Sequence, residues 1–171
     1  MHSAALLRSI QAAAQSLQIE IPTASILKQP DYCTFQILHT PSATQLKVDL
    51  VNDIAYRVGK PTSNPVLGQV DCWEKILTNK LGALFRFEAK DYANIWAISK
   101  HQHFEWMDMF HHARRKDAGL DPVIIAELLR DIPVPRLSEI KWMNKPDLNQ
   151  VQADLARIAT DVLRGSPNHL A

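Results

Sequence analysis

Three ionisable residues stand at positions where a folded protein seldom keeps a charge without a partner. Asp49 lies between apolar residues in a strand-like stretch, Lys80 lies within the apolar stripe of a predicted helix, and Asp91 opens the next helix. A carboxylate held on a strand is a hard oxygen ligand, suited to Mg²⁺ in phosphoryl or nucleotidyl transfer. A lysine on a core-facing stripe must pair with an anion or reach water along its stem. We therefore expect Lys80 to lie within salt-bridge reach of Asp49, Asp91 or a bound phosphate.

Each of these residues also has a structural explanation, which the sequence leaves open. Alternation along the strand places Lys47 beside Asp49, where the two could form an ordinary exposed ion pair. Lys80 could extend to water at the edge of its stripe. Arg86 could complement the dipole at the end of the same helix. Asp91 could serve as the N-cap of the helix that it opens.

Two strands and a series of helices must position these side chains. Segments 32–38 and 46–51 are rich in β-formers and are separated by a turn signal at 40–44, which predicts a pair of strands. A loop rich in proline and small residues covers 59–68. Helical patterns cover 3–18, 71–87, 91–101, 103–118, 121–132 and 147–165.

Local signals give the expected ends of these helices. Asp71, with Glu74 three residues later, forms a capping-box arrangement. Gly119 is expected to stop a helix by supplying a left-handed cap. Asp147 caps the last helix and Gly165 ends it, so we expect the tail that follows to fray.

The length and composition indicate a globular protein, and the order of the predicted strands and helices indicates class α+β. The 171 residues are 46% hydrophobic and 22% charged, and 19 Lys and Arg face 18 Asp and Glu. A global field that would attract polyanions is therefore excluded. We expect a small partial sheet in 1–68 followed by an antiparallel helical bundle in 69–171. Cys33 and Cys72 fit a reducing compartment, and no apolar stretch is long enough to span a membrane, so we expect a cytoplasmic protein.

The order of the motifs resembles the second half of the AbiEii/AbiGii-type nucleotidyltransferase toxins. Those proteins have a strand carboxylate, then a helix with a Lys, a small residue and an Arg, then an Arg/Lys-Asp pair. Here the strand 46–50 reads Leu-Lys-Val-Asp-Leu, the helix has Lys80, Gly82 and Arg86, and the pair is Lys90-Asp91. The resemblance covers about 25–131 and implies a partial nucleotidyltransferase-type sheet.

The resemblance also implies roles for these residues. Asp49 would be the third acidic residue of the catalytic site and its metal ligand, and Lys80 would contact the triphosphate. Asp91 would belong to the late Arg/Lys-Asp motif, with Lys90 in the basic position and Arg86 near the phosphates. Mg²⁺ and a nucleoside triphosphate would be the cofactor and substrate, and an antitoxin would be a partner.

The sequence departs from the family pattern upstream of these motifs. The family begins with a Gly-Gly or Gly-Ser loop and a strand carrying Asp-x-Asp, whereas here no Gly precedes Gly59 and no Asp precedes Asp31. Asn94 also replaces a second late Asp. Two-metal catalysis needs several converging carboxylates. We therefore expect a truncated member of the toxin–antitoxin or abortive-infection type that is inactive alone, unless another chain or an upstream fragment completes the site.

Two other functions remain open on the sequence. The first is a helical module that binds tRNA, another RNA or a protein through the basic segment Arg114-Arg115-Lys116. The second is a hydrolase or metal protein that uses the histidines at 101, 103, 111 and 112, although their spacing matches no zinc pattern. Because strands of the family sheet are missing, we also expect an open sheet edge, which would be covered by the first helix or by a homo-oligomer.

Overall fold

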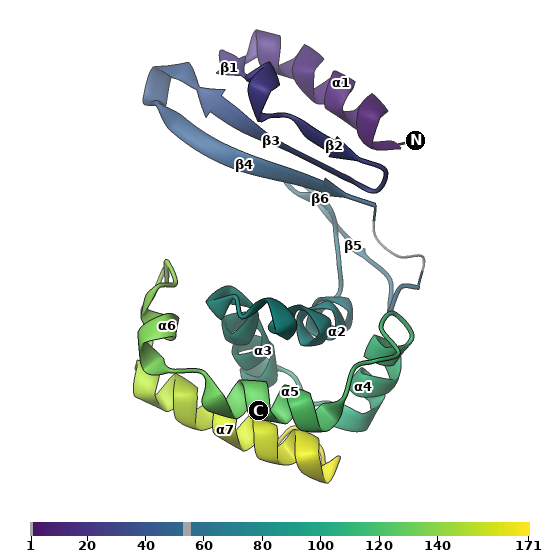
Figure 1. Ribbon diagram of the computed structural model, residues 1–171, viewed down its shortest axis with the longest axis vertical. Helices are drawn as coiled ribbons and strands as arrows, with labels where there is room; N and C mark the ends of the chain where they lie inside the picture. The colour runs from purple at the N-terminus through teal and green to yellow at the C-terminus, as the bar shows by residue number, and fades with distance from the viewer. Residues whose placement is uncertain (1, 53–55) are drawn as a thin grey trace. The chain divides into compact units, whose positions relative to one another are not determined.

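The computed structural model describes residues 2–52 and 56–171, which form two compact units, Met1–Ala55 and Tyr56–Ala171 (Figure 1). The first unit is a small antiparallel sheet with one helix, and the second contains six helices and a short β-hairpin among its described residues. The predicted class, α+β, is confirmed. The division falls before Tyr56 and not after residue 68 as we expected, because the hairpin belongs with the helices.

The sheet of the first unit is built around one central strand. Its elements are α1 (His2–Ser16), β1 (Ile19–Glu20), β2 (Leu27–Gln29), β3 (Tyr32–His39) and β4 (Thr44–Val51). β4 pairs antiparallel with the whole length of β3, and β1 and β2 pair with opposite ends of the other edge of β3. The predicted strand pair and the turn between its members are confirmed. The connector 19–30, where a short strand was open on the sequence, contains two short strands, β1 and β2.

A small core holds the helix against one face of this sheet. Leu7 of α1 is buried with Cys33 and Phe35 of β3, and Val48 and Leu50 of β4 pack against them. Successive strand residues point to opposite faces, so the intervening residues of β4 lie on the face away from α1. The helix therefore packs on the face of the sheet (Figure 1). Of the two coverings we expected for an open edge, this helix or a homo-oligomer, the first is not present among the described residues.

The second unit begins with a hairpin where we predicted a loop. Strands β5 (Thr62–Asn64) and β6 (Gly68–Val70) pair antiparallel. The side-chain oxygen of Asn64 accepts hydrogen bonds from the backbone N–H groups of Val66 and Leu67, each at 2.9 Å. Gly68 adopts a positive φ of 75°, which glycine tolerates without steric cost. Side-chain bonding and one glycine thus make a turn in a segment whose composition indicated irregular structure.

The helices of the second unit surround one hydrophobic core. They are α2 (Trp73–Ala83), α3 (Ala89–His101), α4 (Trp106–Arg114), α5 (Pro122–Asp131), α6 (Val134–Ser138) and α7 (Leu148–Arg164). α5 lies alongside α7 (Figure 1). The largest fully buried side chain is Trp106, and the core around it includes Leu77, Ile95, Ile125, Leu155 and Ile158. None of the described helices is both long and apolar enough to cross a membrane.

Several helix ends follow the predicted signals. Asp121 caps α5 by accepting from the N–H of Val123 at 2.7 Å, and Asp147 caps α7 in the same way. Gly165 ends α7 with a left-handed φ of 60°. An oxygen near the first turn satisfies N–H groups that have no partner within the helix.

Other helix ends differ from the prediction. The N-cap of α2 is Cys72, whose side chain makes no capping hydrogen bond. The Asp71 carboxylate, which we expected to cap this helix, pairs with Lys75 Nζ at 2.7 Å. α4 is shorter than expected. Gly119 has no positive φ, and its N–H donates to the Asp117 side chain at 3.1 Å. A carboxylate that forms an ion pair with a nearby lysine is not available to cap the helix.

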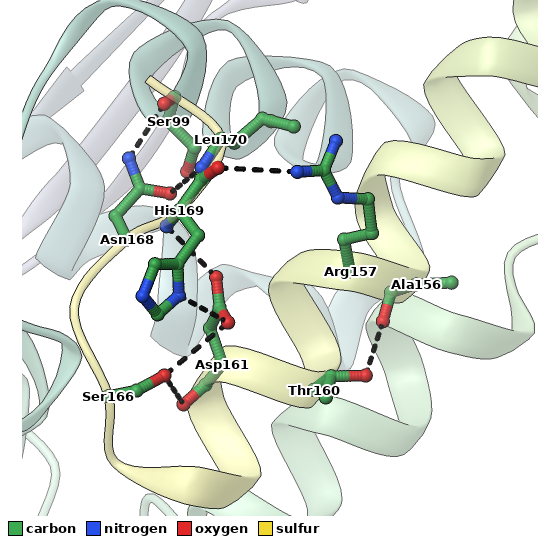
Figure 2. Close-up of polar contacts among 9 residues, drawn as sticks. All are labelled: Ser99, Ala156, Arg157, Thr160, Asp161, Ser166, Asn168, His169 and Leu170. Atoms are coloured by element: carbon green, nitrogen blue, oxygen red, sulfur yellow. Dashed lines mark hydrogen bonds and ion pairs between the residues drawn. The ribbon is translucent and has the colours of Figure 1, made fainter.

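The tail after α7 is fixed in place, and the prediction that it frays is wrong. The buried side chain of Asn168 donates to the backbone carbonyls of Ser99 and Gln102, each at 2.7 Å. The backbone N–H and the Nδ1 atom of His169 contact the Asp161 carboxylate at 3.0 Å and 2.9 Å (Figure 2). The tail therefore ties the end of α3 to α7.

Candidate functional site

The second unit contains a buried carboxylate shared by two cations. Asp91 is 0% exposed, and its Oδ1 atom lies 2.6 Å from Lys80 Nζ. Its Oδ2 atom accepts from Arg86 Nη2 at 3.0 Å. The prediction that Lys80 has a carboxylate within salt-bridge reach is confirmed, and the partner is Asp91. We call these three residues the Lys80–Asp91–Arg86 cluster.

The cluster forms because the chain makes a tight turn between two helices. Lys80 lies in the last turn of α2, and Arg86 lies in the short 3-10 helix η3 (Leu84–Arg86) that follows. Phe87 then adopts a left-handed φ of 55°, which reverses the chain and lets α3 bring Asp91 back toward α2. Three residues that are separated in sequence thus meet around one carboxylate.

Asp91 is not the N-cap of α3, which corrects our structural explanation for it. The helix begins at Ala89, and its N-cap is Glu88, which makes no side-chain cap bond. Asp91 lies in the first helical turn, where a negative charge is favoured by the helix dipole. Its oxygens are used by the two cations, so its role is that of an ion-pair acceptor.

The electrostatics of the cluster leave positive charge facing outward. The side chain of Lys80 is 23% exposed and that of Arg86 is 61% exposed, whereas the carboxylate is fully buried. Two cations share one anion, so the cluster carries a net charge of about +1, and donors of both cations remain for another acceptor. Burial and the charge of Asp91 raise the pKa of the neighbouring Tyr92 phenol.

Lys90 does not join this cluster. It is exposed and lines a polar depression of about 360 Å³ together with Glu88, Arg136 and Lys141. Asn94, the residue that stands where the resembled family has a second late Asp, is also exposed. The Lys90 part of the expected phosphate site is therefore separated from Lys80 and Arg86.

Asp49 belongs to the first unit, where it forms an exposed ion pair. Its carboxylate lies 3.3 Å from Lys47 Nζ and accepts from the Tyr32 hydroxyl at 2.9 Å. Hydrogen bonds from Thr34 and Tyr32 hold the pKa of Asp49 below its ordinary value, and Asp49 in turn raises the pKa of Lys47. The two side chains share one strand face as the alternation predicted.

The described residues contain no group of three or more His, Cys, Asp and Glu side chains arranged to hold a metal ion. Asp49, our expected metal ligand, offers one carboxylate that a lysine already contacts. Among the candidate histidines, His112 bonds through Nδ1 to the Tyr56 hydroxyl at 2.7 Å, and the ring of His111 packs edge-on against that of His112. Asp49 and these histidines do not make a Mg²⁺ site without further oxygen ligands.

The basic segment at the end of α4 makes contacts within its own unit. Arg114 Nε donates to the carbonyl of Leu120 at 2.8 Å. The guanidinium of Arg115 lies over the Tyr56 ring at 4.2 Å from its centroid. Lys116 Nζ donates to the Asn79 side chain at 2.8 Å. Arg114 thus supports the turn between α4 and α5, Arg115 packs on Tyr56, and Lys116 links the end of α4 to α2. The role of the three residues as an RNA contact stays a prediction.

Sequence reasoning missed two buried carboxylates of α7. Asp154 accepts from Trp96 Nε1 at 2.9 Å and from Gln150 Nε2 at 2.8 Å, and Asp161 holds the tail through His169. A signal was present, because the two aspartates are seven residues apart and lie on the apolar stripe of the helix. The same reasoning that singled out Lys80 would have found both.

The helical unit also contains an apolar depression of about 300 Å³. It is lined by Phe87, Tyr92, Ile124, Leu128 and Arg136, among others. The members of the Lys80–Asp91–Arg86 cluster are not among its lining residues, although Phe87 and Tyr92 follow Arg86 and Asp91 directly in sequence.

Comparison with known proteins does not place the chain in a family. No family model matches the sequence, and no curated protein or solved structure matches it either.

Proposed function

We propose that this chain is a nucleotidyltransferase-like protein of the toxin–antitoxin or abortive-infection type. Its helical unit binds the phosphates of a nucleoside triphosphate through Lys80 and Arg86, and the chain does not transfer nucleotides alone. The observation that carries the proposal is the buried Asp91 carboxylate, which holds both cations at 2.6 Å and 3.0 Å. The motif order that resembles the AbiEii/AbiGii-type toxins supports the same assignment.

The arrangement suits phosphate because the anion orients the cations without using all their donors. An ammonium has three N–H donors and a guanidinium has five, and Asp91 takes one from each group. Fixing two flexible side chains in advance lowers the conformational cost of binding. Charge-assisted hydrogen bonds to phosphate oxygens are among the strong ones. The exposed part of Arg86 gives a ligand access to the cluster.

The expected lack of transfer follows from the carboxylates of the sequence. Nucleotidyl transfer with two Mg²⁺ ions needs several carboxylates around ions about 3.5–4 Å apart. No two aspartates are spaced as Asp-x-Asp anywhere in the sequence, and Asp49 alone cannot hold two ions. Mg²⁺ would therefore need ligands from outside these 171 residues, supplied by an upstream fragment or by another chain. Phosphate binding by the helical unit does not require them.

Phosphate binding is tested by calorimetric titration of the purified full chain with inorganic tripolyphosphate and with ATP. Lys80→Met and Arg86→Met should each weaken binding about tenfold or more, because each removes a charge-assisted bond. Arg130→Met and Lys145→Met remove exposed cations elsewhere in the same unit and should leave affinity unchanged. Thermal unfolding of each variant shows whether it is folded. Equal affinity in all four variants would overturn the proposal.

Transfer itself is tested with α-labelled nucleoside triphosphates, Mg²⁺, and tRNA or total protein as acceptors. We expect no labelling by the isolated chain. Metal-dependent labelling that Asp49→Ala abolishes would show that the chain is an active enzyme, and the statement on inactivity would be wrong even if phosphate binding were correct.

A further inference from the structure

The outer edge of β4 has no partner strand among the described residues. β3 occupies one edge of β4 through eight consecutive residue pairs without a bulge, and no strand among the described residues pairs with the other edge. Most side chains of β4 are exposed. A row of unpaired N–H and C=O groups on a regular edge strand is a template for another strand.

The hydrogen-bond pattern between β3 and β4 shows which residues of β4 direct their backbone N–H and C=O groups toward the unpaired edge. The N–H of Asn52 donates to the carbonyl of Asp31 at 2.8 Å. Hydrogen bonds in an antiparallel ladder fall on alternate pairs, so Val48 uses its backbone groups toward β3. Lys47 and Asp49 therefore direct their N–H and C=O groups outward, together with the residues at 45 and 51.

The sequence of β4 is complementary to itself around Val48. If a second copy is placed antiparallel with the two-fold axis at this residue, Lys47 stands opposite Asp49 of the second copy, and Asp49 stands opposite its Lys47. We propose that two copies of this chain associate through their β4 edges in this register and form a continuous sheet. Opposite charges directly across a strand pair stabilise it, and a two-fold interface repeats each such contact.

Both sheet faces support this register. Leu46 is 59% exposed and lies on the same side as Leu50, which packs in the core under α1. In the proposed pair, Leu46 comes opposite Leu50 of the second copy, which extends that apolar cluster across the axis. On the other face, two lysines and two aspartates alternate in sign. The proposal goes beyond nucleotide binding and does not depend on it, because it concerns the first unit.

Charge reversal tests the proposed contact in the full chain by sedimentation velocity over a range of concentrations. Lys47→Asp and Asp49→Lys each place like charges opposite one another twice per dimer, so each should weaken self-association about tenfold or more. An equimolar mixture of the two variants restores opposite charges and should form a heterodimer. The double exchange, Lys47→Asp with Asp49→Lys, should again form a homodimer.

The register is tested by cysteine cross-linking with oxidised glutathione. Val48 would face Val48 of the second copy in a pair without hydrogen bonds, where Cα atoms are about 4.5 Å apart, so Val48→Cys should form a disulfide-linked dimer. Gln45→Cys should not, because its copies would lie about 20 Å apart. The unsubstituted chain, with its free Cys33 and Cys72, is the background.

Three outcomes would overturn the proposal. The first is a chain that stays monomeric at all concentrations, which would leave the edge to a strand from another polypeptide. The second is a dimer whose affinity is unchanged by both single reversals. The third is a cross-link at residue 45 with none at residue 48.

Discussion

The lysine–aspartate pair on the sheet, Lys47 with Asp49, and the pair between two helices, Lys80 with Asp91, differ in what surrounds them. Lys47 and Asp49 lie 3.3 Å apart on an open strand face, with side chains 64% and 43% exposed. Lys80 and Asp91 lie 2.6 Å apart, with side chains 23% and 0% exposed. The first pair joins neighbours on one strand, whereas the second joins two helices.

The comparison shows that a lysine–aspartate pair contributes differently to stability and to association according to its exposure to solvent. An exposed pair contributes little to stability and is screened by salt, so its charges remain available to a partner such as a second copy. A buried carboxylate must keep its counter-charges, because removing them leaves a desolvated ion. We therefore expect the cluster in the helical unit to control stability, and the pair on β4 to control association.

The largest effect is expected at the buried carboxylate. Asp91→Ala leaves Lys80 partly buried without its anion, so it should lower the free energy of unfolding by about 3 kcal/mol. Asp49→Ala should leave it nearly unchanged. Urea denaturation of both variants measures the difference. Equal losses would mean that burial does not separate the two pairs, and the comparison would fail.

A smaller effect is expected when the charges are removed together. The double variant Lys80→Met, Asp91→Leu replaces a buried pair by apolar side chains and should recover at least half of the stability lost in Asp91→Ala, because buried ion pairs often exchange with apolar residues at little cost. Arg86, which is 61% exposed, can turn to water. A double variant no more stable than Asp91→Ala would show that packing at this site, and not charge, sets the loss.

High salt should weaken the coupling free energy of the exposed pair more than that of the buried pair. The coupling between Lys47 and Asp49, measured by a double-mutant cycle, should vanish in 1 M NaCl, where the Debye length is about 3 Å. The coupling between Lys80 and Asp91 should persist, because ions penetrate a buried site poorly. If both couplings fall in the same proportion, the cluster is more accessible than its burial indicates.

The smallest effect concerns Tyr92, the neighbour of the buried carboxylate. Its pKa is raised by burial and by the charge of Asp91 from the ordinary value of 10.0. The folded state therefore resists ionisation of the phenol, and this contribution to stability is full below pH 10 and is lost as pH rises through the folded-state pKa. Tyr92→Phe should lose less stability between pH 9 and pH 11, as followed by urea titration. An identical pH profile would contradict this assignment.

Much of the fold could be predicted from periodicity, because apolar spacing is a local property. The strands around the turn at 40–44, the helix capped by Asp121 and the stripe of α7 all follow from neighbours in sequence. The salt bridge of Lys80 was predicted for the same reason. The interpretation of Asp91 as a helix cap was wrong. Whether Asp91 caps α3 or forms an ion pair depends on the left-handed turn at Phe87. Such a turn is usually signalled by glycine, and a phenylalanine gives no sign of it.

Other features could not be predicted because their partners are distant. The tail is fixed by carbonyls of Ser99 and Gln102, and any residue offers a carbonyl. Asp71 is a different case, because its partner Lys75 is only four residues away and the sequence does not say whether the carboxylate caps the helix or pairs with the lysine. The free edge of β4 follows from the pairing of β3, which the sequence alone does not give.

The contacts of the tail have a consequence for how opening of the helical unit can be observed. The backbone N–H of Asn168 donates to the carbonyl of Phe104 at 2.9 Å, and its side chain holds the end of α3 (Figure 2). This amide can exchange its hydrogen with solvent only when segments more than 60 residues apart in the sequence separate. Its exchange rate therefore reports release of the tail from the end of α3, and a phosphate ligand bound at the Lys80–Asp91–Arg86 cluster would slow this exchange only if it stabilised the packing of the tail as well.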